Sequence, residues 1–207
     1  MMAKLHTVSL GGQTFHARSG QLLLDAALLG GVDMPHDCRA GRCGSCTTRV
    51  KTGITLGGQT HQPGMVHACQ TMVFSDLDLE IEPTPPVTCI KGKVAAVTEI
   101  GRDTVEVAIE PARQVAFLPG QYCRFRFRGF PARPFSPTAA MVPGPHADML
   151  RLHVKRVRDG RVTPHLGRGI RAGHAVSIEG PLGHAYLRSG RTERVVLVGS
   201  GTGFAPV

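Results

Sequence analysis

Four cysteines in the first third of the chain constrain its fold more than any other feature. They follow the spacing C-x4-C-x2-C with a fourth member further on: Cys38, Cys43, Cys46 and Cys69. Four thiolates at this spacing are a ligand set for a 2Fe–2S cluster, which requires a tight loop around the metal. Gly41 and Gly44 lie inside the run, where glycine allows positive φ and close approach of backbone N–H groups to the sulfurs. The spacing therefore predicts that these four cysteines hold a cluster.

Other uses of cysteine fit this spacing less well. A zinc site commonly joins C-x2-C to a second short pair of ligands, and neither His61 nor His67, which lie near Cys69, completes such a pair. Disulfide frameworks are typical of small secreted proteins, whereas residues 1–10 alternate in polarity and lack the apolar stretch of a signal peptide. A zinc-dependent binding module therefore stays only as an alternative.

Length and composition indicate a cytoplasmic protein built from short strands and turns. No run approaches the ~18 continuous apolar residues of a membrane span, so we expect no membrane association, and reduced thiols that can ligate iron are typical of the cytoplasm. The 207 residues fit one large domain or two small ones. With 26 Gly and 15 Pro but 2 Tyr and no Trp, turns punctuate the sequence often.

Positive charge is concentrated in the middle of the chain. Residues 1–82 hold 6 Lys and Arg against 7 Asp and Glu, whereas residues 83–190 hold 16 against 7. Such an excess predicts an anionic ligand, and nucleic acid is one candidate. However, the run Arg124-Phe125-Arg126-Phe127-Arg128 alternates in polarity, which is typical of a half-buried strand with a solvated basic face. We therefore expect the phosphates of a nucleotide cofactor and no nucleic acid.

A Pro-rich stretch at residues 83–86 follows an alternating run at 77–82 and predicts a linker between two domains. The first segment should form strands at residues 4–10, 13–18, 47–51, 70–74 and 77–82. A helix is expected at residues 22–29, capped by Ser19 and ended by Gly30. Residues 1–82 resemble a plant-type ferredoxin of the α+β β-grasp fold, and Ala68-Cys69-Gln70-Thr71 resembles that family's stretch around its fourth cluster ligand.

The second segment, residues 87–190, is expected to fold as an antiparallel β-barrel. Its β-type runs lie at residues 93–100, 104–109, 122–127, 150–157 and 175–178, with turn residues between them. Cys89 and Cys123 lie in this segment, and we interpret both as small buried hydrophobic residues, the common role of a free cysteine.

Three short motifs in this segment resemble the FAD-binding barrel of the ferredoxin–NADP reductase superfamily. They are Arg133-Pro134-Phe135-Ser136, Leu152-His153-Val154-Lys155 and Asp159-Gly160-Arg161-Val162-Thr163. The resemblance implies that Arg133 binds the FAD pyrophosphate, while the Phe135 ring and the Ser136 hydroxyl contact the flavin. It implies that the second lies beside the ribityl and phosphate groups, and that the third leads into a short helix, capped by Thr163, that faces the pyrophosphate. Each motif alone would be an ordinary strand or an exposed turn.

The last residues resemble the beginning of a nicotinamide-binding domain. An apolar strand is expected at residues 193–198, followed by a glycine-rich loop in which Gly201, Thr202 and Gly203 would bind NAD. A complete α/β nucleotide-binding domain needs roughly a hundred residues or more. Residues 191–207 are therefore expected to supply only its first strand, with the chain stopping just inside a third domain.

The order of these segments resembles the reductase component of bacterial multicomponent oxygenases. The resemblance implies an NADH-dependent ferredoxin or oxygenase reductase, in which electrons pass from NADH to FAD, to the 2Fe–2S cluster and then to a terminal oxygenase or small ferredoxin. Two further alternatives stay open. One is a non-enzymatic electron carrier whose residues 87–207 form a docking domain without flavin, and the other is a reductase of the same superfamily that serves a sugar dehydratase.

Overall fold

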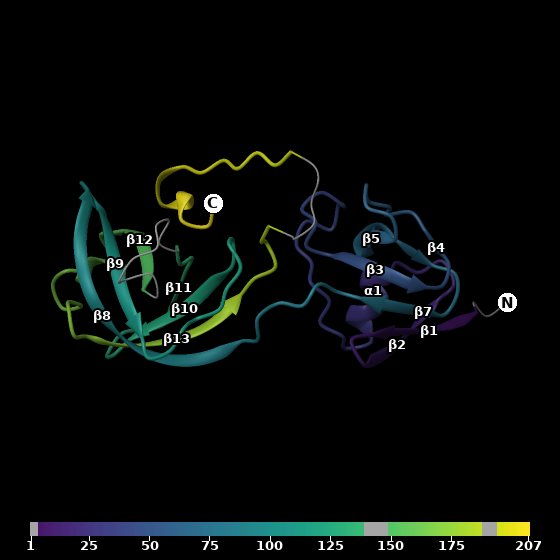
Figure 1. Ribbon diagram of the computed structural model, residues 1–207, viewed down its shortest axis with the longest axis horizontal. Coiled ribbons are helices and arrows are strands. Elements are labelled where there is room, and N and C mark those ends of the chain that lie inside the picture. Colours follow the sequence, from purple (N-terminus) through teal and green to yellow (C-terminus); the bar gives the residue numbers. More distant parts are fainter. Residues whose placement is uncertain (1–3, 139–148, 188–193) are drawn as a thin grey trace. The chain divides into compact units, whose positions relative to one another are not determined.

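The computed structural model describes residues 4–138, 149–187 and 194–207 (Figure 1). The chain divides into two compact units, Met1–Pro83 and Thr84–Val207. The division falls at the Pro-rich stretch, where few residues can contribute to either core. None of the helices formed by the described residues has the length and apolar character needed to cross a membrane.

The first unit is built on a mixed five-stranded sheet. Its strands, in spatial order, are β2 (Gln13–Arg18), β1 (Leu5–Leu10), β7 (Leu77–Glu80), β3 (Thr47–Thr52) and β5 (Met65–His67). β1 and β2 form a hairpin around Gly11 and Gly12, which both have positive φ, as a two-residue turn between strands requires. β1 pairs with β7 in parallel, and the remaining pairs are antiparallel.

One short helix, α1 (Leu23–Leu29), packs on this sheet and buries Leu23, Leu24, Ala26 and Ala27. The helix ends at Gly30, as predicted, and the Gly30 N–H donates to the Ala26 carbonyl at 2.9 Å. The predicted cap at Ser19 is wrong, because Leu22 is the N-cap residue and makes no side-chain cap. Ser19 lies in a preceding turn, where its N–H donates to the Lys4 carbonyl at 2.8 Å. A mixed sheet with a helix across it is the predicted β-grasp fold.

The remaining elements of the first unit are short. β4 (Thr55–Leu56) pairs with β6 (Met72–Val73) in a separate two-stranded sheet. The strand predicted at residues 70–74 is therefore only two residues long, because the 3-10 helix η1 (Ala68–Gln70) takes up its beginning. That helix carries Cys69, which is buried.

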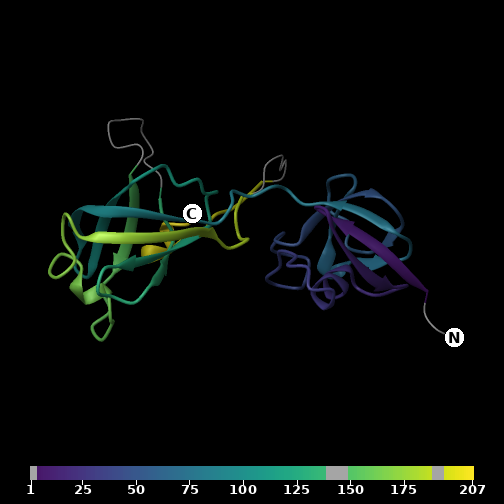
Figure 2. The ribbon, with the colours of Figure 1, turned by 90° about the horizontal axis from the view of Figure 1, so that it is seen from below.

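The second unit is a six-stranded antiparallel sheet that curls into a nearly closed barrel. Its spatial order is β11 (Arg133–Phe135), β10 (Tyr122–Phe127), β13 (Ala175–Leu182), β8 (Thr88–Gly101), β9 (Thr104–Pro111) and β12 (Leu150–Lys155). Figure 2 shows β13 running beside β8, its partner in the sheet. A bridge between Thr138, just after β11, and Arg151 of β12 joins the two ends of the sheet, with backbone N–H to carbonyl distances of 2.9 and 3.4 Å. The predicted barrel is confirmed.

Alternation along the strands fills the barrel interior with apolar side chains. In β10, Cys123, Phe125 and Phe127 point inward and are fully buried, while Arg124 and Arg126 are exposed. The prediction for Cys123 is thus confirmed, but that for Cys89 is wrong, because Cys89 is exposed. Its neighbour Ile90 points into the core, and successive residues of a strand face opposite sides of the sheet.

The C-terminal strand predicted at residues 193–198 is not observed in its described part, residues 194–198, which forms no regular secondary structure. Its apolar side chains are exposed, with Val196 at 78% and Val198 at 85%. A strand of this composition is stabilised by burial between neighbouring strands, and the described residues offer it no such neighbours. The residues that follow form the 3-10 helix η3 (Gly201–Phe204).

Candidate functional site

The loop from Cys38 to Cys46 connects α1 to β3 through several left-handed residues. Arg39, Gly41 and Gly44 have φ values of 53°, 68° and 76°. A side chain at Gly41 would also crowd Gln70, because its Cβ would lie 3.1 Å from the Gln70 Cγ. The Gln70 side chain in turn donates its Nε2–H to the Arg39 carbonyl at 2.9 Å. The loop is thereby held against η1, which carries Cys69.

Backbone N–H groups of the loop point at the sulfur of Cys38. Its Sγ accepts from the N–H groups of Ala40 and Cys43, each at 3.4 Å. These hydrogen bonds, from Ala40 first and then from Cys43 and Arg42, lower the pKa of the Cys38 thiol to about 6. The loop therefore favours the thiolate, which is the form that binds iron.

Cys46 and Cys69 lie together at the buried side of the loop. Their Sγ atoms are 3.3 Å apart, and the Ala68 N–H donates to the Cys46 carbonyl at 3.1 Å. Burial raises the pKa of the Cys46 thiol to about 12, because a thiolate in apolar surroundings lacks the solvation that water gives it. A metal cation at this position would supply the missing compensation.

A polar pair that the sequence motifs did not single out lies beside Cys43. The Ser45 Oγ lies 3.3 Å from the Cys43 Sγ and 2.5 Å from the Asp37 Oδ2. Ser45 lies between two cysteines of the motif, and Asp37 immediately precedes its first cysteine. The cysteine spacing alone carries no sign of this pair, because the contact depends on how the loop folds back on itself.

The loop and η1 place the four sulfurs in two separate pairs. Cys38 and Cys43 form one, through the N–H of Cys43 and a further side-chain contact, and Cys46 and Cys69 form the other. Within the described part of the chain, no three His, Cys, Asp or Glu side chains come close enough to hold a metal ion in common. The donor chemistry nevertheless fits a 2Fe–2S cluster, in which each iron takes two protein ligands and backbone N–H groups face the sulfurs.

The first two flavin-type motifs meet where the barrel closes. β11, which carries Arg133, Pro134 and Phe135, is one end of the sheet, and β12, which carries His153, Val154 and Lys155, is the other. The bridge between Thr138 and Arg151 brings these ends together. Residues about 20 positions apart in sequence thus lie along one seam.

The side chains along β11 differ in what they can offer a ligand. Arg133 is exposed and donates from Nη1 to the Ala132 carbonyl at 3.2 Å, which leaves most of its donors for an anion. Phe135 is half-buried and packs on Phe125 of the core, with ring centroids 6.1 Å apart and planes at 49°. This tilted contact with the core holds the Phe135 ring in place. Ser136 follows it and is also half-buried.

In β12, only alternate side chains of the motif face outward. Val154 lies in the core, His153 is half-buried and Lys155 is exposed. The His153 Nε2 lies 3.4 Å from the Glu106 Oε2, and Glu106 also forms an ion pair with Arg151 at 2.5 Å. This group of polar contacts, on the outward face of β9 and β12, was not predicted from the motif.

The third motif forms a tight turn after β12. The Thr163 Oγ1 accepts from the Val157 N–H at 3.0 Å, and the Gly160 N–H donates to the Val157 carbonyl at 2.8 Å. The 3-10 helix η2 (Thr163–His165) follows, with Val162 as its N-cap residue. The predicted cap by Thr163 is wrong, because Thr163 is the first residue of η2 and the helix has no side-chain cap. Val162 is buried in the core, and Arg161 is exposed.

The glycine-rich residues at the C-terminus form a compact turn. Gly201 has a φ of 56°, and the Gly203 N–H donates to the Ser200 carbonyl at 3.0 Å. Thr202 lies between them, and its carbonyl accepts from the Ala205 N–H at 3.2 Å. Helix η3, which contains all three predicted NAD-binding residues, lies near β12 in the same unit.

Comparison with known families matches each unit to a separate domain. Residues 7–74 match the 2Fe-2S iron-sulfur cluster binding domain, and residues 91–186 match the oxidoreductase FAD-binding domain. The first domain contains all four predicted cluster ligands, and the second contains all three flavin-type motifs. The cofactors implied by the two domains are therefore a 2Fe–2S cluster and FAD.

Several known proteins are similar to this chain across both of its domains. The reductase component of the naphthalene 1,2-dioxygenase system of Pseudomonas putida is 34% identical over 201 residues, which are 91% of this chain and 60% of that protein. The reductase subunit of an aromatic O-demethylase of Amycolatopsis sp. is 34% identical over 218 residues, 97% of this chain and 65% of that one. The crystal structure of the Amycolatopsis reductase GcoB matches 97% of this chain and 65% of its own, at 33% identity and a TM-score of 0.56.

The chain spans 60–65% of the length of these relatives. Within that span, a cluster-binding domain precedes an FAD-binding barrel in the same order along the chain. With these two domains in this order, the chain is similar to ferredoxin–NAD(P)+ reductase components of oxygenase systems.

Proposed function

We propose that this chain carries electrons from NAD(P)H through FAD and a 2Fe–2S cluster to a terminal oxygenase or a small ferredoxin. The observation that carries the proposal is the presence of both redox domains in one chain, in the order found in oxygenase reductase components. A pure electron carrier would need no FAD-binding domain, and a zinc module would need neither. The sugar-dehydratase alternative differs only in the electron acceptor.

The cluster would be held by the two pairs of thiolates on the loop and η1. Cys38 and Cys43 would bind one iron, and Cys46 and Cys69 the other. A 2Fe–2S cluster, when bound, takes up and releases single electrons. The protein contributes the N–H groups of Ala40 and Cys43 at the Cys38 sulfur, and such hydrogen bonds tune the potential.

FAD would lie along the barrel seam between β11 and β12. Arg133 would bind the pyrophosphate through its guanidinium fork, and Lys155 and Arg161, both exposed, would add positive charge. Phe135 and Ser136 would contact the flavin, while Pro134, His153, Val154, Gly160, Val162 and Thr163 would shape the site mainly through their backbone. FAD, when bound, accepts a hydride and returns the electrons one at a time.

The nicotinamide donor would approach the flavin from the side of η3. Gly201, Thr202 and Gly203 would offer close backbone approach to it, since η3 lies near β12. We further propose the division 1–82, 87–190 and 191–207 for the cluster, FAD and nicotinamide portions. A cytoplasmic location follows from the four thiols that must stay reduced.

The test is to purify the 207-residue chain and measure iron, acid-labile sulfide, zinc and flavin together with the visible spectrum. We expect iron and sulfide in equal amounts, stoichiometric FAD and reduction of both chromophores by dithionite. Cluster absorbance without flavin would select the electron carrier with a docking domain. Zinc without iron or sulfide would select the binding module.

A further inference from the structure

The two edges of the sheet in the first unit differ in how they are covered. At the β5 edge, Gln59 bridges to Val66, and the Thr60 N–H donates to the Met65 carbonyl at 3.1 Å. At the opposite edge, among the described residues, β2 pairs with β1 alone. An open edge presents unpaired N–H and carbonyl groups to any extended chain that can reach it.

The register of the hairpin shows which groups of β2 face outward. Leu10 and Gln13 flank the two-residue turn, so they form a hydrogen-bonded pair, and every second pair after them does the same. The backbone groups of Thr14 and His16 therefore point away from β1. The Arg18 N–H lies in the same row, and it donates to the Gln21 Oε1 at 2.8 Å. The Gln21 side chain thus takes the place that a carbonyl of another strand would occupy.

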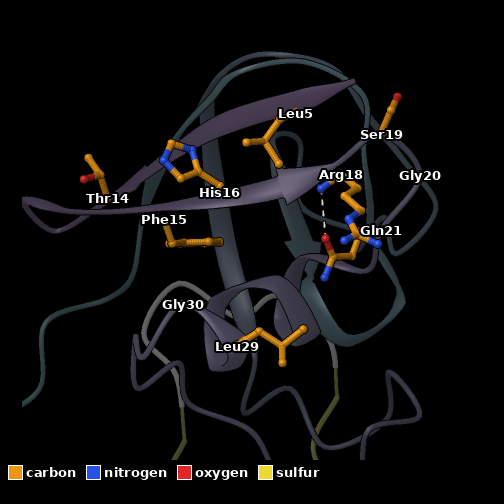
Figure 3. Close-up of a pocket in the computed structure, with 10 residues that line it drawn as sticks. All are labelled: Leu5, Thr14, Phe15, His16, Arg18, Ser19, Gly20, Gln21, Leu29 and Gly30. Atoms are coloured by element: carbon orange, nitrogen blue, oxygen red, sulfur yellow. Dashed lines mark hydrogen bonds between the residues drawn. The ribbon is translucent and has the colours of Figure 1, made fainter. Parts of the chain in front are cut away.

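A hollow of about 840 Å³ follows this edge (Figure 3). On one side of β2 lie Leu5 and His16, and on the other lie Phe15 and, from the end of α1, Leu29. Leu5 is 58% exposed and Leu29 is 81% exposed. Alternate side chains of an added strand would point to the two sides of the sheet, so each would find an apolar contact in this hollow.

The charge of the hollow selects the chemistry of its occupant. Arg18 and His16 line it, and none of its 10 lining residues is acidic. Lys4, just before β1, is exposed nearby and accepts the Ser19 N–H at its carbonyl. A second copy of the same edge would bring like charges together, whereas a segment with carboxylates would complement them.

We propose that the open edge of β2 binds an extended acidic segment of a partner protein by β-strand addition. The backbone of that segment pairs with Thr14 and His16. Its carboxylates lie near Arg18, and its apolar side chains cover Leu29, which is exposed beside the buried Phe15. The competing explanation is that His16 and Arg18 only guard the edge against aggregation, in which case no peptide binds there.

The experiment uses the 207-residue chain with its cluster and FAD, titrated with a capped hexapeptide of alternating glutamate and leucine. A peptide with lysine in place of glutamate is the charge control. Binding is measured by calorimetry, and protection of the Thr14 and His16 amides is measured by hydrogen exchange. We expect the acidic peptide to bind and to protect these amides, and the basic peptide to do neither.

Two variants test the mode of binding. Thr14→Pro removes an outward N–H without removing a hydrogen bond to β1, so it should weaken the acidic peptide by about tenfold or more, while Thr14→Val should not. Unchanged cluster and flavin spectra show that the variant is folded. Should Thr14→Pro fail to fold, Arg18→Glu replaces it and should reverse the preference between the two peptides.

Three results would overturn the proposal. The first is that neither peptide protects the edge, and the second is that Thr14→Pro and Thr14→Val bind the acidic peptide equally. The third is a concentration-dependent dimer, detected by sedimentation, that buries the same amides, since the edge would then belong to a second copy of the chain.

Discussion

The Ser45 hydroxyl lies 2.5 Å from the Asp37 carboxylate, which makes it a donor to that carboxylate. The same oxygen lies 3.3 Å from the Cys43 Sγ. Since a hydroxyl has one proton, the proton that Ser45 gives to Asp37 is not available to the sulfur. Asp37 also places a negative charge within two hydrogen bonds of a proposed iron ligand. Both effects disfavour reduction of the cluster, because the negative charge of the added electron is left without a compensating hydrogen bond or cation.

Asp37→Asn is therefore expected to raise the reduction potential of the cluster by an amount on the order of tens of millivolts. The substitution removes the charge and weakens the hold on the Ser45 proton. The measurement is a redox titration followed by electron paramagnetic resonance. Asp33→Asn, an exposed carboxylate in the same approach to the loop, is the matched control and should change the potential less. Equal shifts in the two variants would show that only net charge matters.

Cys69→Ser should lose the cluster or make it unstable, because Cys69 is the partner of Cys46 at 3.3 Å. Cys89→Ser is the control, since Cys89 is an exposed cysteine of the barrel. Iron content and visible absorbance after purification distinguish the two variants. A normal cluster spectrum in Cys69→Ser would remove Cys69 from the ligand set.

Arg133→Ala should weaken FAD binding. A charge-assisted hydrogen bond to a phosphate contributes about 1.5–3 kcal/mol, which corresponds to roughly ten- to hundredfold in affinity. Arg102→Ala removes an exposed cation from the turn between β8 and β9 and should leave the affinity unchanged. The comparison is made by titrating apoprotein with FAD and following flavin fluorescence. Loss of affinity in both variants alike would assign the effect to the general positive charge of the domain.

Cys123 should make the stability of the barrel depend on alkaline pH. Burial raises the pKa of its thiol from 9.0 to about 11, so the unfolded chain releases this proton at a lower pH than the folded one. The stabilising contribution is complete below pH 9.0 and is lost as the pH rises toward about 11. The expected loss is about 1.4 kcal/mol per pH unit within that window.

The measurement is urea unfolding of the wild-type chain and of Cys123→Ala at about pH 8 and about pH 10. Cys123→Ala should be less stable than wild type at the lower pH, because it leaves a cavity. Its stability should also fall less between the two pH values. Parallel pH dependence of the two proteins would mean that the thiol keeps an ordinary pKa in the folded barrel.

Sequence reasoning succeeded where a local period decides the structure. The alternation of Arg124, Phe125 and Arg126 predicted a strand with one buried face, and β10 has that pattern. It failed where a distant partner decides. Cys89 faces outward in the register that pairs it with Glu179 of β13. Leu22 rather than Ser19 is the N-cap residue of α1, because the Ser19 N–H lies in a turn that binds the Lys4 carbonyl.

The same division applies to the candidate site. Cysteine spacing predicted the loop, and the glycines inside it have the positive φ that the prediction required. The contact of Ser45 with Asp37 and the commitment of the Thr163 hydroxyl to Val157 were not predictable. Both hydrogen bonds depend on the three-dimensional path of the loop, which determines the donor and acceptor that lie close together. A sequence motif does not specify that path.

The closing bridge of the barrel has a consequence for the cofactor. Among the described residues, two backbone hydrogen bonds between Thr138 and Arg151 join the wall, and the proposed FAD site runs along that same join. A ligand with contacts on both β11 and β12 would hold the two strands together from outside the barrel. Departure of FAD and parting of these strands would then be coupled events, and the apoprotein would expose two strand edges that the holoprotein conceals.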